Sequence, residues 1–228
     1  QVQLSHHICH NADDILDSAE KARRANDILA IYAEKDIDVW CWTHEFRSPP
    51  EAFIQDKRLD FDQNALWEHL ERKYDRFFNE VLPGLTGIVL TFAETHFPVY
   101  KDRNIRSALS REERTVKLIN AMRNICEHHG KKLAIRDFVY RLDEIHRMTN
   151  TLHDIHDDVI VMSKCVPHDW EPFYPDNPTI GAYGAKPQWV EYDLGHEYEG
   201  QHLYPFAEVE TNLRRLRYGY SQGVSSVI

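Results

Sequence analysis

The sequence lacks the signatures of several protein classes. Its four cysteines, Cys9, Cys41, Cys126 and Cys165, are far apart and form no CxxC pair, which argues against a disulfide scaffold and against a zinc ribbon. No apolar run approaches the roughly 18 residues of a membrane-spanning helix. The phosphate-cradling loops GxGxxG and GxxxxGK[ST] are also absent. We therefore expect no membrane span and no nucleotide-binding loop.

A basic excess is missing as well. The chain has 27 Lys and Arg against 37 Asp and Glu, a formal net charge of -10. Because binding nucleic acid requires clustered basic residues, a general polyanion binder is not expected, although a local basic pocket is compatible with this balance. The 14 histidines include the clusters HHICH, CEHHG and HDIHDD, whose spacings match neither HExxH nor a C-x2-C pair. We interpret most of them as surface histidines and predict no metal and no cofactor.

Both ends of the sequence bear on its completeness. The chain begins with QVQLSHHICH, without Met or a signal peptide, and ends on the apolar GVSSVI, which is predicted as a strand. We expect a fragment of a longer protein, with residues 1–228 forming a single partial domain. The compartment and the oligomeric state of that protein are not indicated by the sequence.

Short β-branched, aromatic or apolar runs alternate with longer helical patterns. Helices are predicted over 13–35, 63–82, 110–130 and 208–221, the third opening on the capping box of Ser110 and Glu113. This alternation is typical of βαβ units around a parallel sheet. Five clear strands are predicted at 36–46, 86–95, 131–140, 158–166 and 188–196, and weaker ones at 1–5, 179–183 and 223–228.

Each of the five clear strands starts apolar and ends on polar residues. In a (β/α)8 barrel all such ends meet at one face, where the active site lies, whereas in a doubly wound sheet they meet only near the switch point. We therefore predict an α/β fold, a (β/α)8 TIM barrel that is incomplete, with about six to seven strands present. The polar strand ends are Thr43-His44-Glu45, Glu94-Thr95-His96, Arg136-Asp137, Lys164 and His196-Glu197.

The acids at these strand ends suggest glycoside hydrolysis. One carboxylic acid must protonate the leaving oxygen, while a second carboxylate activates water or attacks directly. Glu94 and Glu197 end two different strands, and Asp169 lies just beyond a third. The alternative interpretation is that these acids cap the strands or are solvated.

Aromatic residues near the same strand ends suggest sugar stacking. Their apolar faces suit pyranose rings and their N–H and O–H groups suit hydroxyls, although core packing is the alternative. These residues are Trp40, Trp42, Trp170, Trp189, Tyr192 and Tyr198. Nucleophilic catalysis is disfavoured, because Cys41 and Cys165 fall in strands as predicted core thiols and no GxSxG motif occurs. The long loop 167–187 is expected to be functional.

Four segments, in order, resemble one family. VEYDLGHEYEGQ (190–201) resembles the EFQ-x-TQEY-x-G segment of glycoside hydrolase family 67, the xylan α-glucuronidases. VIVMSKCVPHDWEPFYP (159–175) is similar to that family's VVLQIKNGPIDFQPREPF-type stretch, and LAIRDFVY (133–140) resembles its MWRAFVY. GIVLTFAET (87–95) resembles the strand that ends in the family's general acid. The resemblance covers roughly residues 85–205, and the match is ungapped across 158–201.

The resemblance implies an inverting mechanism on a (β/α)8 barrel. It makes Glu94 the general acid and gives Asp169 and Glu197 the task of holding and deprotonating the attacking water. Arg136 and Lys164 then bind the uronate carboxylate, for which a guanidinium and an ammonium are physically apt. Further predicted substrate contacts are His44, Glu45, His168, Trp170, Tyr192, His196 and Tyr198.

The sequence also departs from the family. Leu90 stands at the position of a family Lys, Phe92-Ala93 replaces a small polar run, and EFQ becomes Glu191-Tyr192-Asp193. These changes leave the hydrolase residues intact but open the substrate to another uronate or a neutral sugar. We predict an α-glucuronidase-like hydrolase whose only indicated partner is an acidic carbohydrate such as glucuronoxylan. The alternatives are a polysaccharide lyase, a retaining glycosidase and a non-catalytic carbohydrate-binding barrel.

Overall fold

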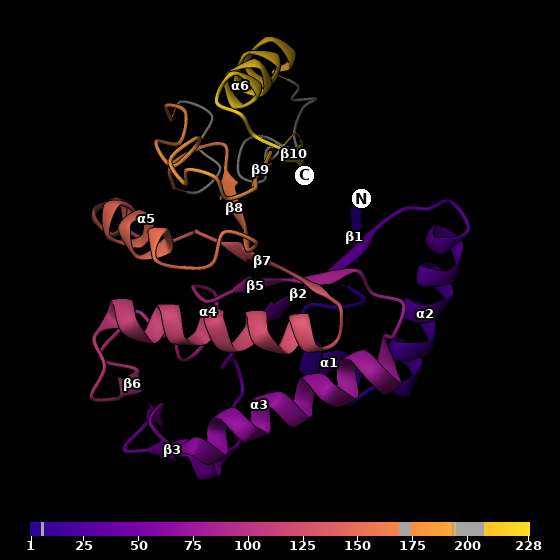
Figure 1. Ribbon diagram of the computed structural model, residues 1–228, viewed down its shortest axis with the longest axis vertical. Coiled ribbons are helices and arrows are strands. Elements are labelled where there is room, and N and C mark those ends of the chain that lie inside the picture. The colour runs from indigo at the N-terminus through magenta and orange to yellow at the C-terminus, as the bar shows by residue number, and fades with distance from the viewer. Residues whose placement is uncertain (6, 169–173, 193, 195–207) are drawn as a thin grey trace, which may run out of the picture. The chain divides into compact units, whose positions relative to one another are not determined.

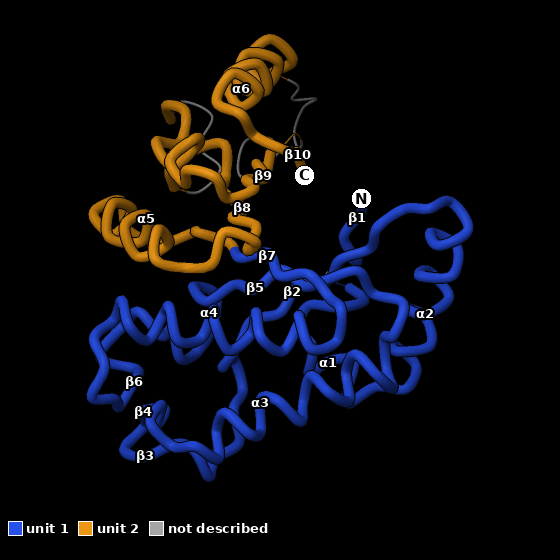
Figure 2. The backbone as a smooth tube through the Cα atoms, viewed as in Figure 1, with its two compact units in different colours: residues 1–135 blue, residues 136–228 orange. Residues whose placement is uncertain are grey.

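Two compact units make up the protein. The computed structural model describes residues 1–228 except residues 6, 169–173, 193 and 195–207. Unit 1 comprises residues 1–135 and unit 2 residues 136–228 (Figure 2). The expectation of a single domain over 1–228 stays a prediction.

Parallel strands form the centre of unit 1 (Figure 1). Trp40 pairs with Gly87 and Leu90 pairs with Ile135. Every residue of the two strands Val39–His44 and Gly87–Thr91 is buried, as expected for a parallel sheet that is covered on both faces. In order across the sheet, the strands are β1 (Val2–Gln3), β2 (Val39–His44), β5 (Gly87–Thr91) and β7 (Lys132–Arg136), whose last residue opens unit 2.

Unit 2 continues the strand order with β8 (Ile160–Lys164), β9 (Gln188–Glu191) and β10 (Ser226–Val227), again in parallel. The five clear strands and the weaker strands at both ends of the sequence are thereby confirmed. The weaker strand at 179–183 is wrong. These residues form turns, in which Gly181 adopts a φ of 79° and its N–H donates to Gln188 Oε1 at 2.7 Å.

The helices of unit 1 largely follow the predicted pattern. The prediction over 13–35 divides into two helices, because Ser18 caps the second and its Oγ accepts from Lys21 N at 3.3 Å. The predicted capping box is confirmed, since Glu113 N donates to Ser110 Oγ and Ser110 N donates to Glu113 Oε2. These helices are α1 (Ala12–Leu16), α2 (Ala19–Ala33), α3 (Asn64–Arg76) with the π-helix η2 (Phe77–Val81), and α4 (Arg111–His128).

Several short elements have no counterpart in the predictions. Unit 1 contains the 3-10 helix η1 (Glu51–Phe53) and a small sheet of β3 (Ile54–Gln55), β4 (Arg58–Asp60) and β6 (Ile105–Arg106). Unit 2 contains η3 (Leu142–Glu144) and α5 (Ile145–His153), besides the predicted α6 (Val209–Ser221).

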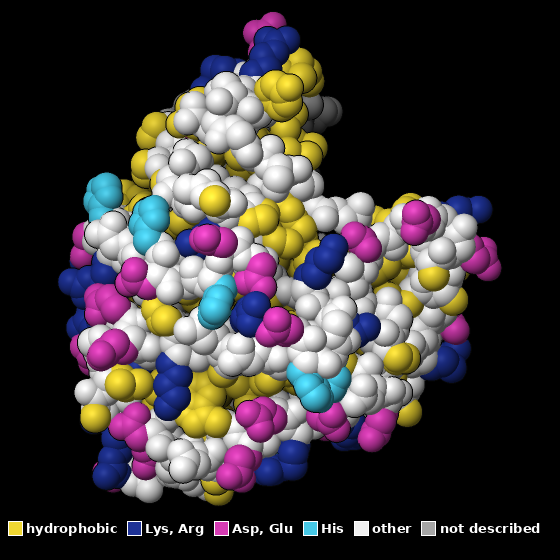
Figure 3. All heavy atoms as spheres, viewed as in Figure 1, with side chains coloured by type: hydrophobic (Ala, Val, Ile, Leu, Met, Phe, Trp, Pro, Cys, Tyr) yellow, Lys and Arg dark blue, Asp and Glu magenta, His cyan; other side chains and the backbone are white. Residues whose placement is uncertain are grey.

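The charged surface, the helices and the buried cysteines can be compared with what the composition predicted. Figure 3 shows Lys and Arg side chains interspersed with Asp and Glu side chains on the face that it draws. None of the helices in the described part of the chain combines the length and the apolarity needed to cross a membrane. Cys41 and Cys165 are confirmed as buried thiols that form no disulfide.

A close approach of the backbone explains Gly87. A Cβ at this position would lie 2.4 Å from Lys132 O and 2.5 Å from Trp40 Cζ3. We expect Gly87→Ala to lower the free energy of unfolding by about 3 kcal/mol, measured by urea denaturation, because both neighbours belong to the packed sheet. Gly84→Ala is the control, since its Cβ would lie 3.8 Å from the nearest Leu29 atoms. Equal losses in the two variants would contradict this account.

Candidate active site

In unit 1, the ends of β2 and β5 bring together two predicted site residues. His44 ends β2, and Glu94 lies three residues beyond Thr91, the last residue of β5. His44 Nε2 is 3.9 Å from Glu94 Oε2, and the two side chains are 2% and 38% exposed. Thr95 Oγ1 donates to Glu45 O at 2.8 Å and holds the segment after β5 against the end of β2. The result is a solvent-accessible carboxyl group beside a buried imidazole.

His10 completes this group, although the sequence analysis did not predict it as a site residue. Its ring stacks on the ring of His44 with centroids 4.6 Å apart and planes 8° apart. Its carbonyl oxygen lies 2.8 Å from His44 Nδ1. Burial and the positive charge of Arg47 lower the pKa of His10, against the opposing charges of Asp14 and Glu94. The signals in the sequence were the cluster HHICH, which ends on His10 and was interpreted as surface histidines, and its position soon after the first predicted strand.

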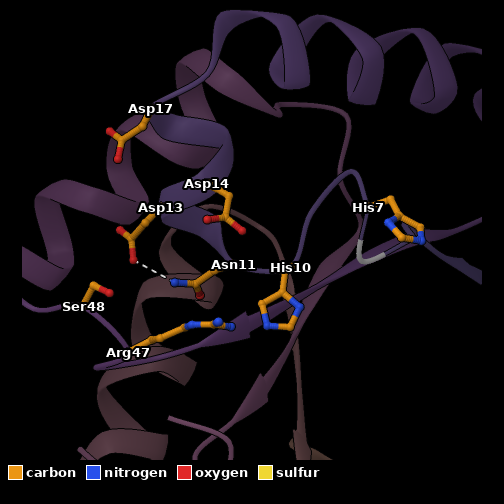
Figure 4. A pocket seen from close by; sticks show the side chains of 8 residues that line it. All are labelled: His7, His10, Asn11, Asp13, Asp14, Asp17, Arg47 and Ser48. Atoms are coloured by element: carbon orange, nitrogen blue, oxygen red, sulfur yellow. Dashed lines mark hydrogen bonds between the residues drawn. The ribbon is translucent and has the colours of Figure 1, made fainter. Parts of the chain in front are cut away.

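A cleft of about 550 Å³ opens beside His10 (Figure 4). It is formed by the segment after β1, by α1 and by the turn after β2. It therefore lies at the carboxyl ends of the strands, where active sites of (β/α)8 barrels are found. The lining residues are His7, His10, Asn11, Asp13, Asp14, Asp17, Arg47 and Ser48.

A buried ionic network supports one side of the cleft. The carboxylate of Glu45 accepts from Thr43 Oγ1 at 2.9 Å, from Lys73 Nζ at 3.0 Å and from the hydroxyl of Tyr74. Lys73 Nζ also donates to Asp13 Oδ2 at 3.0 Å. Burial alone would raise the pKa of Glu45, but the Lys73 charge and the hydrogen bonds lower it below its usual value. Glu45 is 2% exposed, so these contacts give it a structural role, and its role as a substrate ligand stays a prediction.

Asn11 connects this network to the histidines. Its Nδ2 donates to Asp13 Oδ2 at 2.9 Å, and its Oδ1 accepts from His44 N at 2.8 Å and lies 3.2 Å from Thr43 Oγ1, whose proton goes to Glu45. The segment after β1 is thereby fixed to the end of β2.

In unit 2, Arg136 is paired with a carboxylate of the protein itself. Its Nε and Nη2 donate to the two carboxylate oxygens of Glu191, both at 2.8 Å. Arg136 ends β7 and Glu191 ends β9, and their side chains are 6% and 16% exposed. Sequence reasoning predicted Arg136 as a uronate ligand. The bidentate pair shows that Arg136 links the ends of β7 and β9. Its role as a uronate ligand stays a prediction.

Lys164, at the end of β8, lies on an aromatic ring. Its Nζ is 4.1 Å from the centroid of Phe138, and the guanidinium carbon of Arg136 is 5.1 Å from the same centroid. Cation–π attraction stabilises this grouping, which brings two predicted uronate ligands together.

Two other residues of unit 2 that were predicted to contact substrate form hydrogen bonds within this unit. His168 Nε2 is hydrogen-bonded to Tyr140 O. The hydroxyl of Tyr192 donates to Arg215 O at 3.2 Å, and its ring packs on the core around Val190. Burial raises the pKa of Tyr192 to about 12. Sugar contacts by these two residues stay predictions.

Part of the predicted site lies outside the described residues: Asp169, Trp170, His196, Glu197 and Tyr198. Trp40, Trp42 and Trp189 are buried and belong to the core. Among the residues with described positions, no three His, Cys, Asp or Glu side chains are grouped so as to hold a metal ion.

Arg136→Ala tests the support role. Removing the guanidinium leaves Glu191 mostly buried without its bidentate partner, so we expect the free energy of unfolding to fall by about 3 kcal/mol. Arg141→Ala is the control, since Arg141 and Asp143 are each 66% exposed and an ion pair in solvent adds little to stability. Urea denaturation measures both variants. Unchanged stability in Arg136→Ala, with weaker binding of glucuronate, would instead assign Arg136 to the ligand.

Comparisons with known proteins define the fold. No family model and no curated protein sequence matches the chain. Among solved structures, it is similar to a glycoside hydrolase family 138 enzyme targeting pectin rhamnogalacturonan II (TM-score 0.58, 11% identity, 91% of this chain and 24% of that chain). It is also similar to a GH5-4 broad-specificity endoglucanase from an uncultured bacterium (TM-score 0.51, 10% identity, 92% and 68%). A third is an old yellow enzyme homologue from Zymomonas mobilis (TM-score 0.53, 8% identity, 92% and 67%).

These likenesses confirm an incomplete (β/α)8 barrel of the kind found in glycosidases. The chain spans about a quarter of the family 138 enzyme. At 8 to 11% identity the likeness shows the fold alone, and a barrel fold hosts many activities. None of these three structures is described as a family 67 enzyme.

Proposed function

We propose that the chain carries the catalytic residues of an inverting, α-glucuronidase-like glycoside hydrolase acting on a uronic-acid-bearing saccharide. Glu94 is the general acid that protonates the leaving oxygen. Asp169 and Glu197 hold and deprotonate the attacking water, following the resemblance of their segments to family 67.

The observation that carries the proposal is the pairing of Glu94 with His44. A carbonyl oxygen only accepts hydrogen bonds, so the contact to His10 O assigns the proton of a neutral His44 to Nδ1. The Nε2 lone pair then faces the Glu94 carboxyl group 3.9 Å away. His44 thus positions the carboxyl group of Glu94, and Glu94, whose side chain is 38% exposed, regains from water the proton that it gives to the leaving oxygen in each turnover.

Support for an acidic sugar comes from Lys164 and Arg136. Both cationic side chains converge on the Phe138 ring in unit 2. An ammonium and a guanidinium on one aromatic ring suit a carboxylate ligand.

The product anomer tests this function. Glucuronoxylan oligosaccharides would be incubated with the protein while proton NMR follows the released uronate. Inversion from an α-linkage yields the β-anomer first, before mutarotation. The α-anomer first would indicate a retaining enzyme, and an unsaturated uronate would indicate a lyase. Saturable binding without cleavage would identify a non-catalytic barrel.

A further inference from the structure

The cleft of unit 1 combines hydrogen-bond donors and acceptors in a way that the proposed chemistry does not use. Two of its lining residues are already engaged with the protein. Asn11 is buried and bonds to Asp13 and to the backbone of His44, and Asp13 bonds to Lys73. These residues form the wall of the cleft.

Arg47 and Asp14 are different. Both line the cleft, but within the described part of the chain neither side-chain head group has a hydrogen bond or an ion pair to another side chain. An Arg and an Asp that line one cleft without forming an ion pair leave a set of donors and a set of acceptors facing the same space. A guanidinium offers only donors, and a carboxylate offers only acceptors.

The backbone before Arg47 is held in an unusual conformation. Phe46 has a φ of 62°, a left-handed value that is uncommon for a bulky residue and tends to occur at functional sites. Its ring is 5% exposed and packs edge-on against the rings of Phe61 and Trp67. This anchor fixes the turn that carries Arg47 into the cleft.

The cleft is connected to the proposed general acid. The ring of His10 lines the cleft and stacks on His44, and His44 in turn faces Glu94. A ligand in the cleft therefore meets the ring of His10, which is linked to the proposed general acid through His44.

We propose that this cleft binds a neutral pyranose unit of the substrate, the sugar that carries the leaving oxygen, with Arg47 and Asp14 contacting neighbouring hydroxyls. Each sugar hydroxyl both donates and accepts, so vicinal hydroxyls satisfy a guanidinium and a carboxylate together. An acidic sugar fits less well, because Asp14 and Asp17 line the same cleft and repel an anion. This inference rests on the proposed function for the role of Glu94, but the binding itself is separate.

Calorimetry with the full chain tests the site without turnover. Xylotriose and cellotriose are the neutral probes, and glucuronate is the anionic probe. We expect saturable binding of a neutral probe, and a dissociation constant at least about ten-fold higher in Arg47→Ala and in Asp14→Ala, because each loses hydrogen bonds to a charged group. Arg23→Ala and Asp27→Ala are matched controls, since they remove the same charges from an exposed pair on α2. We expect their affinities to be unchanged.

Several outcomes overturn the site. They are unchanged affinity for the neutral probes in both cleft variants, no neutral binding at all, and glucuronate binding that Arg47→Ala abolishes. Asp14→Asn, which keeps the size of the side chain, replaces Asp14→Ala if circular dichroism shows that the latter is unfolded. Cleavage with unchanged neutral-probe affinity in the cleft variants refutes the subsite alone. Neutral binding that the cleft variants weaken, without any cleavage, refutes the proposed function alone.

Discussion

We expect Glu94→Gln to lower the turnover of glucuronoxylan oligosaccharides about 1,000-fold, because the amide has no acidic proton to transfer to the leaving oxygen. The expected dissociation constant for the same oligosaccharide is unchanged within a factor of about two, since the substitution preserves size and hydrogen-bonding capacity. Initial rates from reducing-end assays and calorimetric affinities measure the two effects. Glu94 is 38% exposed, so the variant should also unfold at the same urea concentration as the natural chain.

The leaving group provides the control for this prediction. The leaving group of a dinitrophenyl uronide is a weakly basic phenolate that needs little protonation. Glu94→Gln should therefore retain most of its activity on that substrate. A loss of about 1,000-fold on both substrates would show that Glu94 acts in another way than as the general acid. Glu80→Gln, an exposed carboxylate of the same unit, should change neither rate.

Lys73→Met lowers the free energy of unfolding by about 4 kcal/mol, because it leaves the carboxylate of Glu45 buried without its counter-charge. Lys73 and Glu45 are 7% and 2% exposed, and the same ammonium also binds Asp13. Arg72→Met on the same helix is the control. Its pair with Glu68 is 68% and 63% exposed, and its loss should cost no more than about 0.5 kcal/mol.

The pH dependence of this loss separates charge from packing. The pKa of Glu45 is lowered in the folded protein, so its ionic contribution is present above its unfolded pKa and disappears as the pH falls through the folded pKa. The difference in stability between the natural chain and Lys73→Met should therefore be full at neutral pH and shrink in acid. A difference that stays constant from pH 7 to strongly acidic conditions would attribute the loss to packing.

The main sheet was predictable because its strands are short apolar runs buried on both faces. β2 and β5 could be predicted from their own residues, because β-branched or aromatic residues are common in them and all their residues are buried in the structure. The capping box of Ser110 and Glu113 likewise predicted the start of α4. Signals of this kind depend only on neighbours along the chain.

Elements without local signals were missed. α5 has no side-chain cap at its N-terminus, and Thr149 and Thr151 are poor helix formers, so tertiary packing of Ile145 and Met148 determines it. The strands β3 and β6 have two residues each, too few for a periodicity. Their existence depends on pairing between segments far apart in the sequence.

The site was predictable only as a set of strand ends. Polar residues after β2, β5, β7 and β8 indicated where chemistry could lie, and the pair of His44 and Glu94 followed that pattern. The partners Glu191 for Arg136 and Lys73 for Glu45 were not predictable, because they depend on strand register and on the rotation of α3. In both cases a carboxylate of the protein neutralises the cation. The sequence assigned Arg136 to a ligand and gave Lys73 no role.

The left-handed turn at Phe46 has a thermodynamic consequence for the cleft. Its strain is balanced on folding by the aromatic packing of Phe61 and Trp67, before any saccharide arrives. The backbone that carries Arg47 is thus preorganised, and binding does not have to order it. We expect the entropy lost on association to come from the sugar and the Arg47 side chain, with the loop itself contributing little.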